Sequence, residues 1–172
     1  MQYSTFLSPL GEIRMLASEA GLAAAYFPVQ ARKLEARLAP GGFRPGRGNL
    51  FLLRAEAYLA CYFDGDLDFS PEIPFDMRGT PFQVGVWTAL GEIAPGRRLS
   101  YGELASRMGR PAAVRAVAAA IGRNPLSIFV PCHRVVGADG SLKGYAGGVT
   151  KKRFLLEHER RCATVGQQAL AA

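Results

Sequence analysis

The chain has 172 residues, 49% of them hydrophobic and 20% charged, a size and composition typical of one globular domain or two small ones. No apolar run approaches the ~18 residues that a membrane-spanning helix needs. Residues 1–10 lack the basic and apolar regions of a secretory signal. We therefore expect a cytoplasmic protein with no membrane partner.

The cysteines and histidines argue against a disulfide framework or a metal site. The three cysteines, Cys61, Cys132 and Cys162, are an odd number and show no Cys-x-x-Cys spacing. The chain has only two histidines, too few for the usual zinc ligand sets. We expect no bound metal and no cofactor.

The positive charge is concentrated in the C-terminal half. Residues 1–78 hold 8 Lys/Arg and 9 Asp/Glu, a net charge of −1, whereas residues 79–172 hold 13 and 5, a net charge of +8. A basic domain beside a nearly neutral one favours a polyanionic partner, although a merely solvated basic surface is the alternative.

Residues 1–78 are predicted to form a small α+β domain. Gly11 and Gly21 flank apolar runs, a pattern typical of a hairpin-like meander. Residues 30–38 and 50–63 have the periodicity of helices. Nothing in this half indicates catalysis.

A linker rich in proline, residues 71–79, leads into the second half. Thr80 and Pro81 then have the pattern of an N-cap followed by a first-turn proline. The helix that they begin is expected to bury Phe82, Val86, Trp87 and Leu90.

Two short helices and a tight turn follow, over residues 101–108, 109–111 and 111–122, which is helix-turn-helix spacing. The second helix is rich in alanine, and Arg115 is its only long polar side chain. Sequence readout needs several such side chains, so this helix favours indiscriminate DNA binding with local distortion over a transcription regulator. An alanine-rich core helix is the structural alternative.

The apolar run at residues 128–130 is predicted to be a buried strand that ends at Pro131, because proline cannot continue ladder pairing. Cys132 would then lie at the mouth of this strand as a candidate nucleophile. The neighbouring His133 and Arg134 would favour the thiolate by their positive charge.

A last helix is predicted over residues 151–160, capped by Thr150. Leu155 and Glu159 are four residues apart and share a face, so we expect Glu159 to be paired inward. In an extended backbone Cys132 and His133 would point to opposite sides, which favours a water relay between them, with Glu159 orienting the histidine.

The region from about residue 79 to 159 resembles the O6-alkylguanine-DNA alkyltransferases. The resemblance rests on five blocks that occur in the right order and spacing. These are RAV at 115–117, NP at 124–125, PCHRV at 131–135, YAGG at 145–148 and LLEHE at 155–159.

The resemblance implies an α+β fold with a ribonuclease-H-like N-terminal domain over residues 1–78. It also implies a mostly helical, winged-helix-like domain over residues 79–165 that binds DNA and accepts the alkyl group. Residues 166–172 would form a tail. The implied activity is a suicidal methylated-DNA--protein-cysteine S-methyltransferase that flips the damaged base out of the duplex.

The resemblance also implies roles for individual residues. Cys132 would be the nucleophile, activated through water by His133 and Glu159, with Asn124 bracing the adjacent turn. Arg115 would replace the extruded nucleotide. Tyr101 would also be catalytic, because it would donate toward the guanine ring. The residues expected to contact DNA or the base are Tyr101, Arg115, Ile121, Val135, Tyr145 and Ala146.

Two other functions stay open on the sequence: a non-catalytic DNA-lesion binder of the same superfamily, and a thiol hydrolase that uses Cys132, His133 and Glu159. The expected partner is duplex DNA that contains O6-alkylguanine, bound by a monomer. The range of alkyl groups, activity on O4-alkylthymine and clustering on DNA are left open.

Overall fold

The computed structural model describes residues 1–39 and 41–169, and it contains both helices and a β-sheet. This mixed architecture confirms the predicted α+β class. None of the helices in that part of the chain has the length and apolarity that a bilayer span requires.

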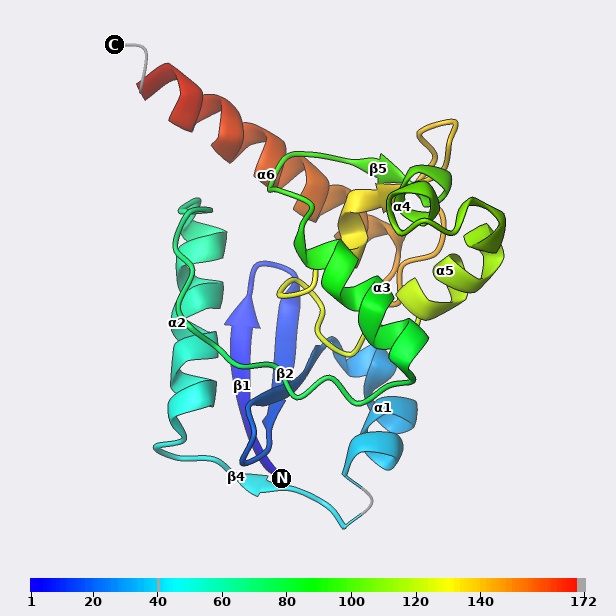
Figure 1. The fold of residues 1–172 in the computed structure, drawn as a ribbon. Helices are drawn as coiled ribbons and strands as arrows, with labels where there is room; N and C mark the ends of the chain where they lie inside the picture. Colours follow the sequence, from blue (N-terminus) through cyan, green and yellow to red (C-terminus); the bar gives the residue numbers. More distant parts are fainter. Residues whose placement is uncertain (40, 170–172) are drawn as a thin grey trace. The chain divides into compact units, whose positions relative to one another are not determined.

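The chain forms two compact units, shown in Figure 1. The first consists of Met1–Arg78 together with Pro125–Ser127, and the second of Gly79–Asn124 and the chain from Ile128 onward. Three residues that we expected in the C-terminal domain therefore belong to the first unit.

The first unit is built on a four-stranded sheet with strand order β3-β2-β1-β4. Strands β2 (Gly11–Ala17) and β3 (Leu22–Tyr26) form the predicted hairpin-like meander. Strand β1 (Gln2–Ser8) pairs antiparallel with β2, and β4 (Arg44–Pro45) adds in parallel to β1. The sequence analysis did not identify β1, because its partly exposed side chains leave no apolar run.

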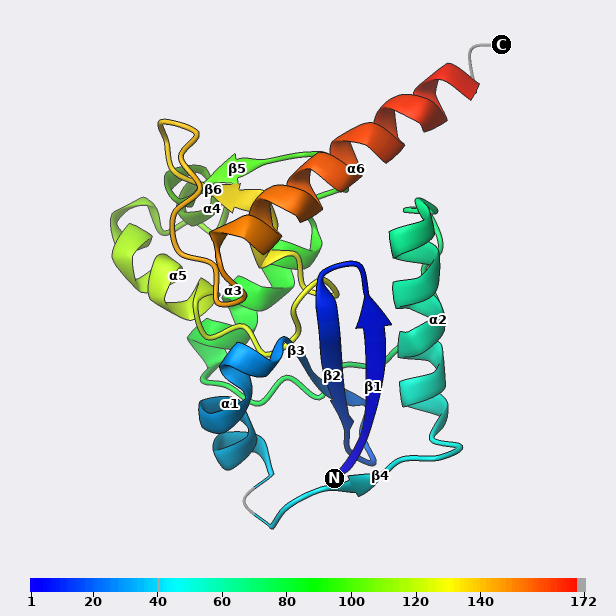
Figure 2. The same cartoon turned by 180° about the vertical axis from the view of Figure 1, so that it is seen from behind.

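Helices cover both faces of this sheet, as Figures 1 and 2 show. After the 3-10 turn η1 (Pro28–Gln30), α1 (Ala31–Leu38) packs on one face, and α2 (Leu50–Asp64) packs on the other, where Phe6 stacks on Phe63. The α1 face buries Leu16, Ala24, Tyr26, Leu34 and Leu38.

The segment that precedes the Cys132 region is attached to the edge strand β3. The N–H of Ala25 donates to the carbonyl of Pro125 at 2.9 Å, and the N–H of Ser127 donates to the carbonyl of Ala25 at 2.7 Å. The next residue, Ile128, has φ of 75°, a left-handed conformation that a β-branched residue rarely adopts. The predicted strand at residues 128–130 is therefore wrong, because the chain turns there.

The second unit begins with α3 (Pro81–Gly91), whose N-terminus has the predicted cap in the form of a Thr80–Gln83 capping box. Trp87 is fully buried, and its Nε1 donates to the carbonyl of Ala120 at 2.9 Å, which ties α3 to the following helices. Of the four side chains expected in the core, Val86, Trp87 and Leu90 are buried, and Phe82 is only half-buried.

The helix-turn-helix consists of α4 (Tyr101–Arg107) and α5 (Val114–Ile121). The predicted start of the second helix at Pro111 needs correction, because Pro111–Ala113 forms the 3-10 turn η2. Two short parallel strands, β5 (Leu99–Ser100) and β6 (Val135–Val136), flank these helices.

The last helix, α6 (Val149–Ala169), is longer than the predicted 151–160. Residues beyond 160 include alanine and glutamine, which favour helix, and no proline interrupts them. Leu155 and Glu159 are both buried, which confirms that this face points inward. Residues 170–172 of the predicted tail lie outside the described residues.

The open face of α3 predicts a stabilising substitution at Gly85. A Cβ added at Gly85 would meet no atom within 4 Å. Because glycine costs more backbone entropy than alanine in a helix, Gly85→Ala should raise the free energy of unfolding by about 0.5–1 kcal/mol. Urea denaturation measures this change.

Gly21→Ala is the contrasting variant. Gly21 has φ of +148°, and a Cβ there would lie 2.1 Å from the carbonyl oxygen of Pro74. The Gly21→Ala substitution should lower the free energy of unfolding by more than about 1 kcal/mol. A less stable Gly85→Ala protein would contradict the described surroundings of α3.

Candidate active site

Cys132 begins a single 3-10 turn, η3 (Cys132–Arg134), directly after Pro131. The backbone is therefore not extended here, and the argument that Cys132 and His133 point to opposite sides does not apply. The predicted position at the mouth of a strand is wrong because residues 128–130 form a turn, and Cys132 is only 6% exposed. A substrate can reach the sulfur only if it is delivered into the protein.

The surroundings of the Cys132 sulfur are polar rather than purely apolar. Burial raises the pKa of the Cys132 thiol, whereas a side-chain hydrogen bond from Asn124 and the positive charge of Lys152 act in the opposite direction. The thiol therefore needs both a base and a nearby cation to become a nucleophile.

His133 is oriented as a base by Glu159. Its Nε2 lies 2.7 Å from Oε1 of Glu159, and both side chains are 0% exposed. Burial, together with the positive charges of Arg134 and Lys152, lowers the pKa of His133, although Glu159 acts to raise it. A neutral His133 donates its Nε2–H to Glu159 and keeps a lone pair on Nδ1, which has no hydrogen-bond partner.

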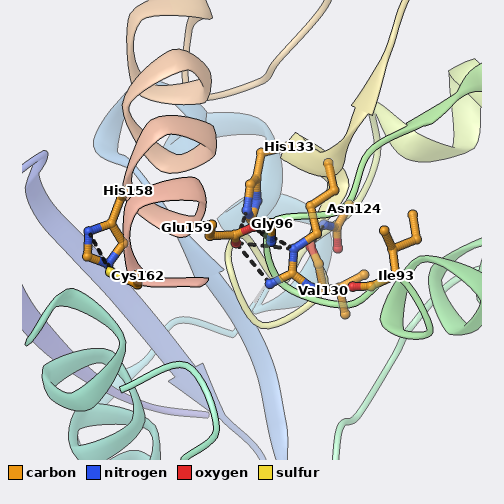
Figure 3. Close-up of polar contacts among 9 residues, drawn as sticks. Ile93, Gly96, Asn124, Val130, His133, His158, Glu159 and Cys162 are labelled. Carbon is orange, nitrogen blue, oxygen red and sulfur yellow. Dashed lines mark hydrogen bonds and ion pairs between the residues drawn. The ribbon is translucent and has the colours of Figure 1, made fainter. Parts of the chain in front are cut away.

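Glu159 is the centre of a buried polar network (Figure 3). Its carboxylate accepts from Nη2 of Arg134 at 2.9 Å, from Nε of Arg134 at 3.0 Å and from the N–H of Gly96 at 3.0 Å. Burial acts to raise the pKa of Glu159, but His133 and Arg134 outweigh it and hold this pKa well below its usual range.

The predicted role of Arg134 beside the thiol needs correction. Its guanidinium pairs with Glu159 and donates to the carbonyl of Ile93, so its charge is neutralised within the network. His133 is held neutral and adds no cation either. The charge that acts on Cys132 comes from Lys152 instead.

Asn124 connects the end of α5 to the segment before Cys132. Its Nδ2 donates to the carbonyl of Val130 at 2.8 Å, and its side chain also hydrogen-bonds the Cys132 thiol. Because the asparagine is buried, it can fix the turn that carries the nucleophile.

Two tyrosines from different segments border the site. The hydroxyl of Tyr101 donates to the carbonyl of Lys143 at 3.1 Å, and burial together with Cys132 raises the pKa of Tyr101. The ring of Tyr145 is buried and stands edge-on to His133, with 6.5 Å between ring centroids. Val135 is buried in β6, whereas Ala146 is exposed in the loop after Tyr145.

The exposed surface of α5 carries small side chains and one long cation. Arg115 is exposed there beside Ala116 and Ala119, as expected of a helix that approaches DNA closely without reading its sequence. Ile121 is only 4% exposed, on the core side of α5. The expected contact of Ile121 with DNA or the base stays a prediction.

Lys152 is the site residue that the sequence analysis missed. It lies three and seven residues before Leu155 and Glu159, so helical spacing places it on the same inward face of α6. This spacing was the available signal, but a lysine in a basic sequence suggests a solvated surface.

No metal centre accompanies this site in the described residues: no three His, Cys, Asp or Glu side chains come together there. His158 and Cys162 form a separate pair on α6, with 3.9 Å between Sγ and Nδ1 (Figure 3).

The burial of Glu159 predicts a large stability loss in Glu159→Gln. Removing one partner of a buried ion pair leaves Arg134 without an anion and should cost about 3–5 kcal/mol in urea denaturation. Glu157→Gln, an exposed change on the same helix, should stay within about 0.5 kcal/mol.

The same variant has a defined pH dependence. Because the folded-state pKa of Glu159 is depressed, its stabilisation is complete above the unfolded-state value and is lost as the pH falls. The gap between wild type and Glu159→Gln should therefore narrow below about pH 4. A constant gap down to pH 3 would contradict the buried ion pair.

Comparisons with known proteins match this chain to one family. Residues 81–161 match the family model described as the DNA-binding domain of 6-O-methylguanine DNA methyltransferase. A methylated-DNA--protein-cysteine methyltransferase of Methanosarcina acetivorans is 42% identical over 162 residues, which cover 94% of this chain and 100% of the relative. The Salmonella typhimurium protein of the same name is 54% identical over 101 residues, 59% of each chain.

Among solved structures, Mycobacterium tuberculosis OGT in complex with DNA superposes with a TM-score of 0.83. It is 39% identical in sequence, and the match covers 94% of each chain. The similarity thus extends over both units as well as the motif blocks. The chain belongs to the O6-methylguanine-DNA methyltransferases, the family of the methylated-DNA--protein-cysteine methyltransferases.

Proposed function

We propose that this protein repairs O6-alkylguanine in duplex DNA by transferring the alkyl group once to Sγ of Cys132. The observation that supports the proposal most is the oriented His133, the residue next to Cys132, which donates to Glu159 and keeps Nδ1 without a hydrogen-bond partner. This arrangement suits removal of a thiol proton.

The first step is deprotonation of Cys132. Nδ1 of the neutral His133 accepts the thiol proton through one water molecule, and Glu159 stabilises the imidazolium that forms. Asn124 and Lys152 stabilise the thiolate. Arg134 keeps the carboxylate ionised at neutral pH, so Glu159 orients the histidine without taking its proton.

The second step is displacement at the alkyl carbon. A sulfur lone pair forms the S–C bond while the C–O6 bond breaks, and its electron pair leaves with guanine, which takes up a proton. The product is a thioether, which has no carbonyl that water can attack. Each protein molecule therefore acts once, as a suicidal methyltransferase.

The burial of Cys132 requires that the damaged base leave the stack. The small side chains of α5 permit close approach to the minor groove, and Arg115 fills the space that the base vacates. The net charge of +8 over residues 79–172 supplies attraction to phosphates.

The flipped guanine would be recognised largely by backbone groups. Tyr101 donates toward the ring, while backbone groups of Cys132, Val135 and Ala146 contact the base edge. Tyr145 forms one wall. We further propose that the protein acts as a monomer in the cytoplasm.

Cys132→Ser tests the nucleophile. The variant should bind duplex DNA and show no transfer from labelled O6-methylguanine, because the serine hydroxyl is a far weaker nucleophile at neutral pH. Peptide mapping of the wild type should find the label on Cys132, at no more than one per protein.

Cys61→Ser is the matched control and should transfer normally. Label on another residue would refute the assignment of Cys132. Repeated release of product would favour the thiol hydrolase, and tight binding without transfer in the wild type would favour the lesion binder.

Arg115→Ala tests base flipping. Loss of the inserted cation should slow repair of duplex DNA by about tenfold or more, equivalent to about 1.4 kcal/mol, and should spare reaction with free O6-methylguanine. Single-turnover rates on both substrates measure the difference.

Arg107→Ala removes another exposed cation of the helix-turn-helix and should weaken DNA binding with little effect on the rate at saturating DNA. Equal losses on duplex and free base in Arg115→Ala would rule out insertion of this side chain.

A further inference from the structure

Phe82, at the start of α3, was expected in the core but is only half-buried. The guanidinium of Arg110 lies over its ring, with 5.6 Å between Cζ and the ring centroid. A guanidinium at this distance is attracted by the negative potential of the ring face. The ring of Phe82 therefore holds a cation that belongs to the turn of the helix-turn-helix.

The backbone of Arg110 is fixed on both sides, in the turn between α4 and η2. Its N–H donates to the carbonyl of Ala105 at 2.9 Å, and its carbonyl accepts from the N–H of Ala113 at 2.9 Å. Gly109, directly before it, has φ of 69°, a conformation that favours glycine and makes the turn tight. Backbone and side chain of Arg110 are thus both held in place before a partner binds.

The positive charge of Arg110 is not balanced by a carboxylate. The residue is exposed, and none of the ion pairs in the part of the chain that the structure describes includes it. Arg107 differs, because it lies one helical turn after Glu103 on α4. A ring attracts a cation without neutralising its charge. Arg110 therefore keeps its charge for an anion outside the protein.

Duplex DNA would supply that anion as a backbone phosphate. Arg110 lies in the turn that leads into α5, the helix whose small exposed side chains permit close approach to DNA. Phosphates border the groove that such a helix approaches, and contacts to them fix its position on the duplex. A guanidinium can donate two parallel hydrogen bonds to one phosphate.

We propose that Phe82 is a positioning residue for DNA binding, and that its ring holds the Arg110 guanidinium ready to contact one backbone phosphate. The proposal rests on the proposed function for duplex DNA as the partner, and it adds a part for α3, a helix outside the helix-turn-helix.

The benefit of this arrangement is entropic. A long arginine side chain that moves freely in water loses rotamer freedom when it binds a phosphate, and this loss weakens binding. The ring of Phe82 restricts Arg110 in the unbound protein, so less freedom is lost on binding. The ring acts on affinity through the arginine alone and needs no contact with DNA.

The test measures binding of a duplex without a damaged base, by fluorescence anisotropy over a range of salt concentrations. Arg110→Ala should weaken binding by about three- to tenfold and should reduce the slope of log K against log salt by about 0.9, the value for one phosphate contact. Phe82→Leu keeps the arginine and an apolar side chain. It should weaken binding by about two- to fivefold and leave the slope unchanged.

A double-mutant cycle separates positioning from a general effect on the fold. In an Arg110→Ala background, Phe82→Leu should change the affinity by less than about 1.5-fold. Phe82→Tyr keeps an aromatic ring and should retain the affinity of the wild type. Arg44→Ala, which removes an exposed cation of β4, is the matched control and should leave the slope unchanged. If Phe82→Leu does not fold, Phe82→Met provides the same comparison.

Three results would overturn the proposal. These are an equal loss from Phe82→Leu with and without Arg110, a loss in Phe82→Tyr as large as in Phe82→Leu, and an unchanged slope in Arg110→Ala. Each of them would show that the ring does not act through a phosphate contact of Arg110.

A second arm follows methyl transfer from a duplex that contains O6-methylguanine. At saturating DNA, Phe82→Leu should transfer at the rate of the wild type, because the ring acts on binding and not on the chemical step. If the binding results are as expected but the wild type transfers no methyl group, the proposed function fails and the phosphate contact stands. If transfer occurs but the cycle shows no coupling, the contact fails and the proposed function stands.

Discussion

The buried carboxylate of Glu159 is the interaction on which the second unit depends. It accepts hydrogen bonds from the side chains of His133 and Arg134, which both belong to η3. It also accepts one from the backbone N–H of Gly96, which follows α3. A carboxylate in this position is stable only because each of its partners donates to it. The same contacts that join α6 to the rest of the unit also set the tautomer of the candidate base.

Two groups of buried charged side chains lie near the nucleophile, and they differ in net charge. The pair formed by Glu159 and Arg134 is neutral overall and fixes His133, whereas Lys152 is a cation that lacks a carboxylate. Burial alone would keep Cys132 protonated. A neutral base on one side and an unpaired cation on the other are the means by which a buried thiol can still react. Burial and reactivity of the sulfur are thus compatible.

Local patterns predicted most of the elements, and the failures share a physical cause. The Thr80 cap, the glycine-flanked meander and the inward face of Glu159 all depend on side chains close in sequence. The prediction of a strand at residues 128–130 was wrong because the apolar composition of this segment indicates only burial. A buried turn has the same composition as a buried strand. Its conformation is set by the attachment of Pro125–Ser127 to β3, a contact made with residues some hundred positions earlier.

The sequence by itself determined the class of chemistry: a thiol after a proline, a histidine beside it and a glutamate on a helix face are read from spacing and motif blocks. Tertiary structure decided how those groups work. It buried the sulfur, gave Arg134 to Glu159 rather than to the thiol, and placed Lys152 beside Cys132. These outcomes depend on which charges share the low-dielectric interior. Which charges lie together there depends on distances between residues far apart in the sequence, and no local sequence pattern encodes those distances.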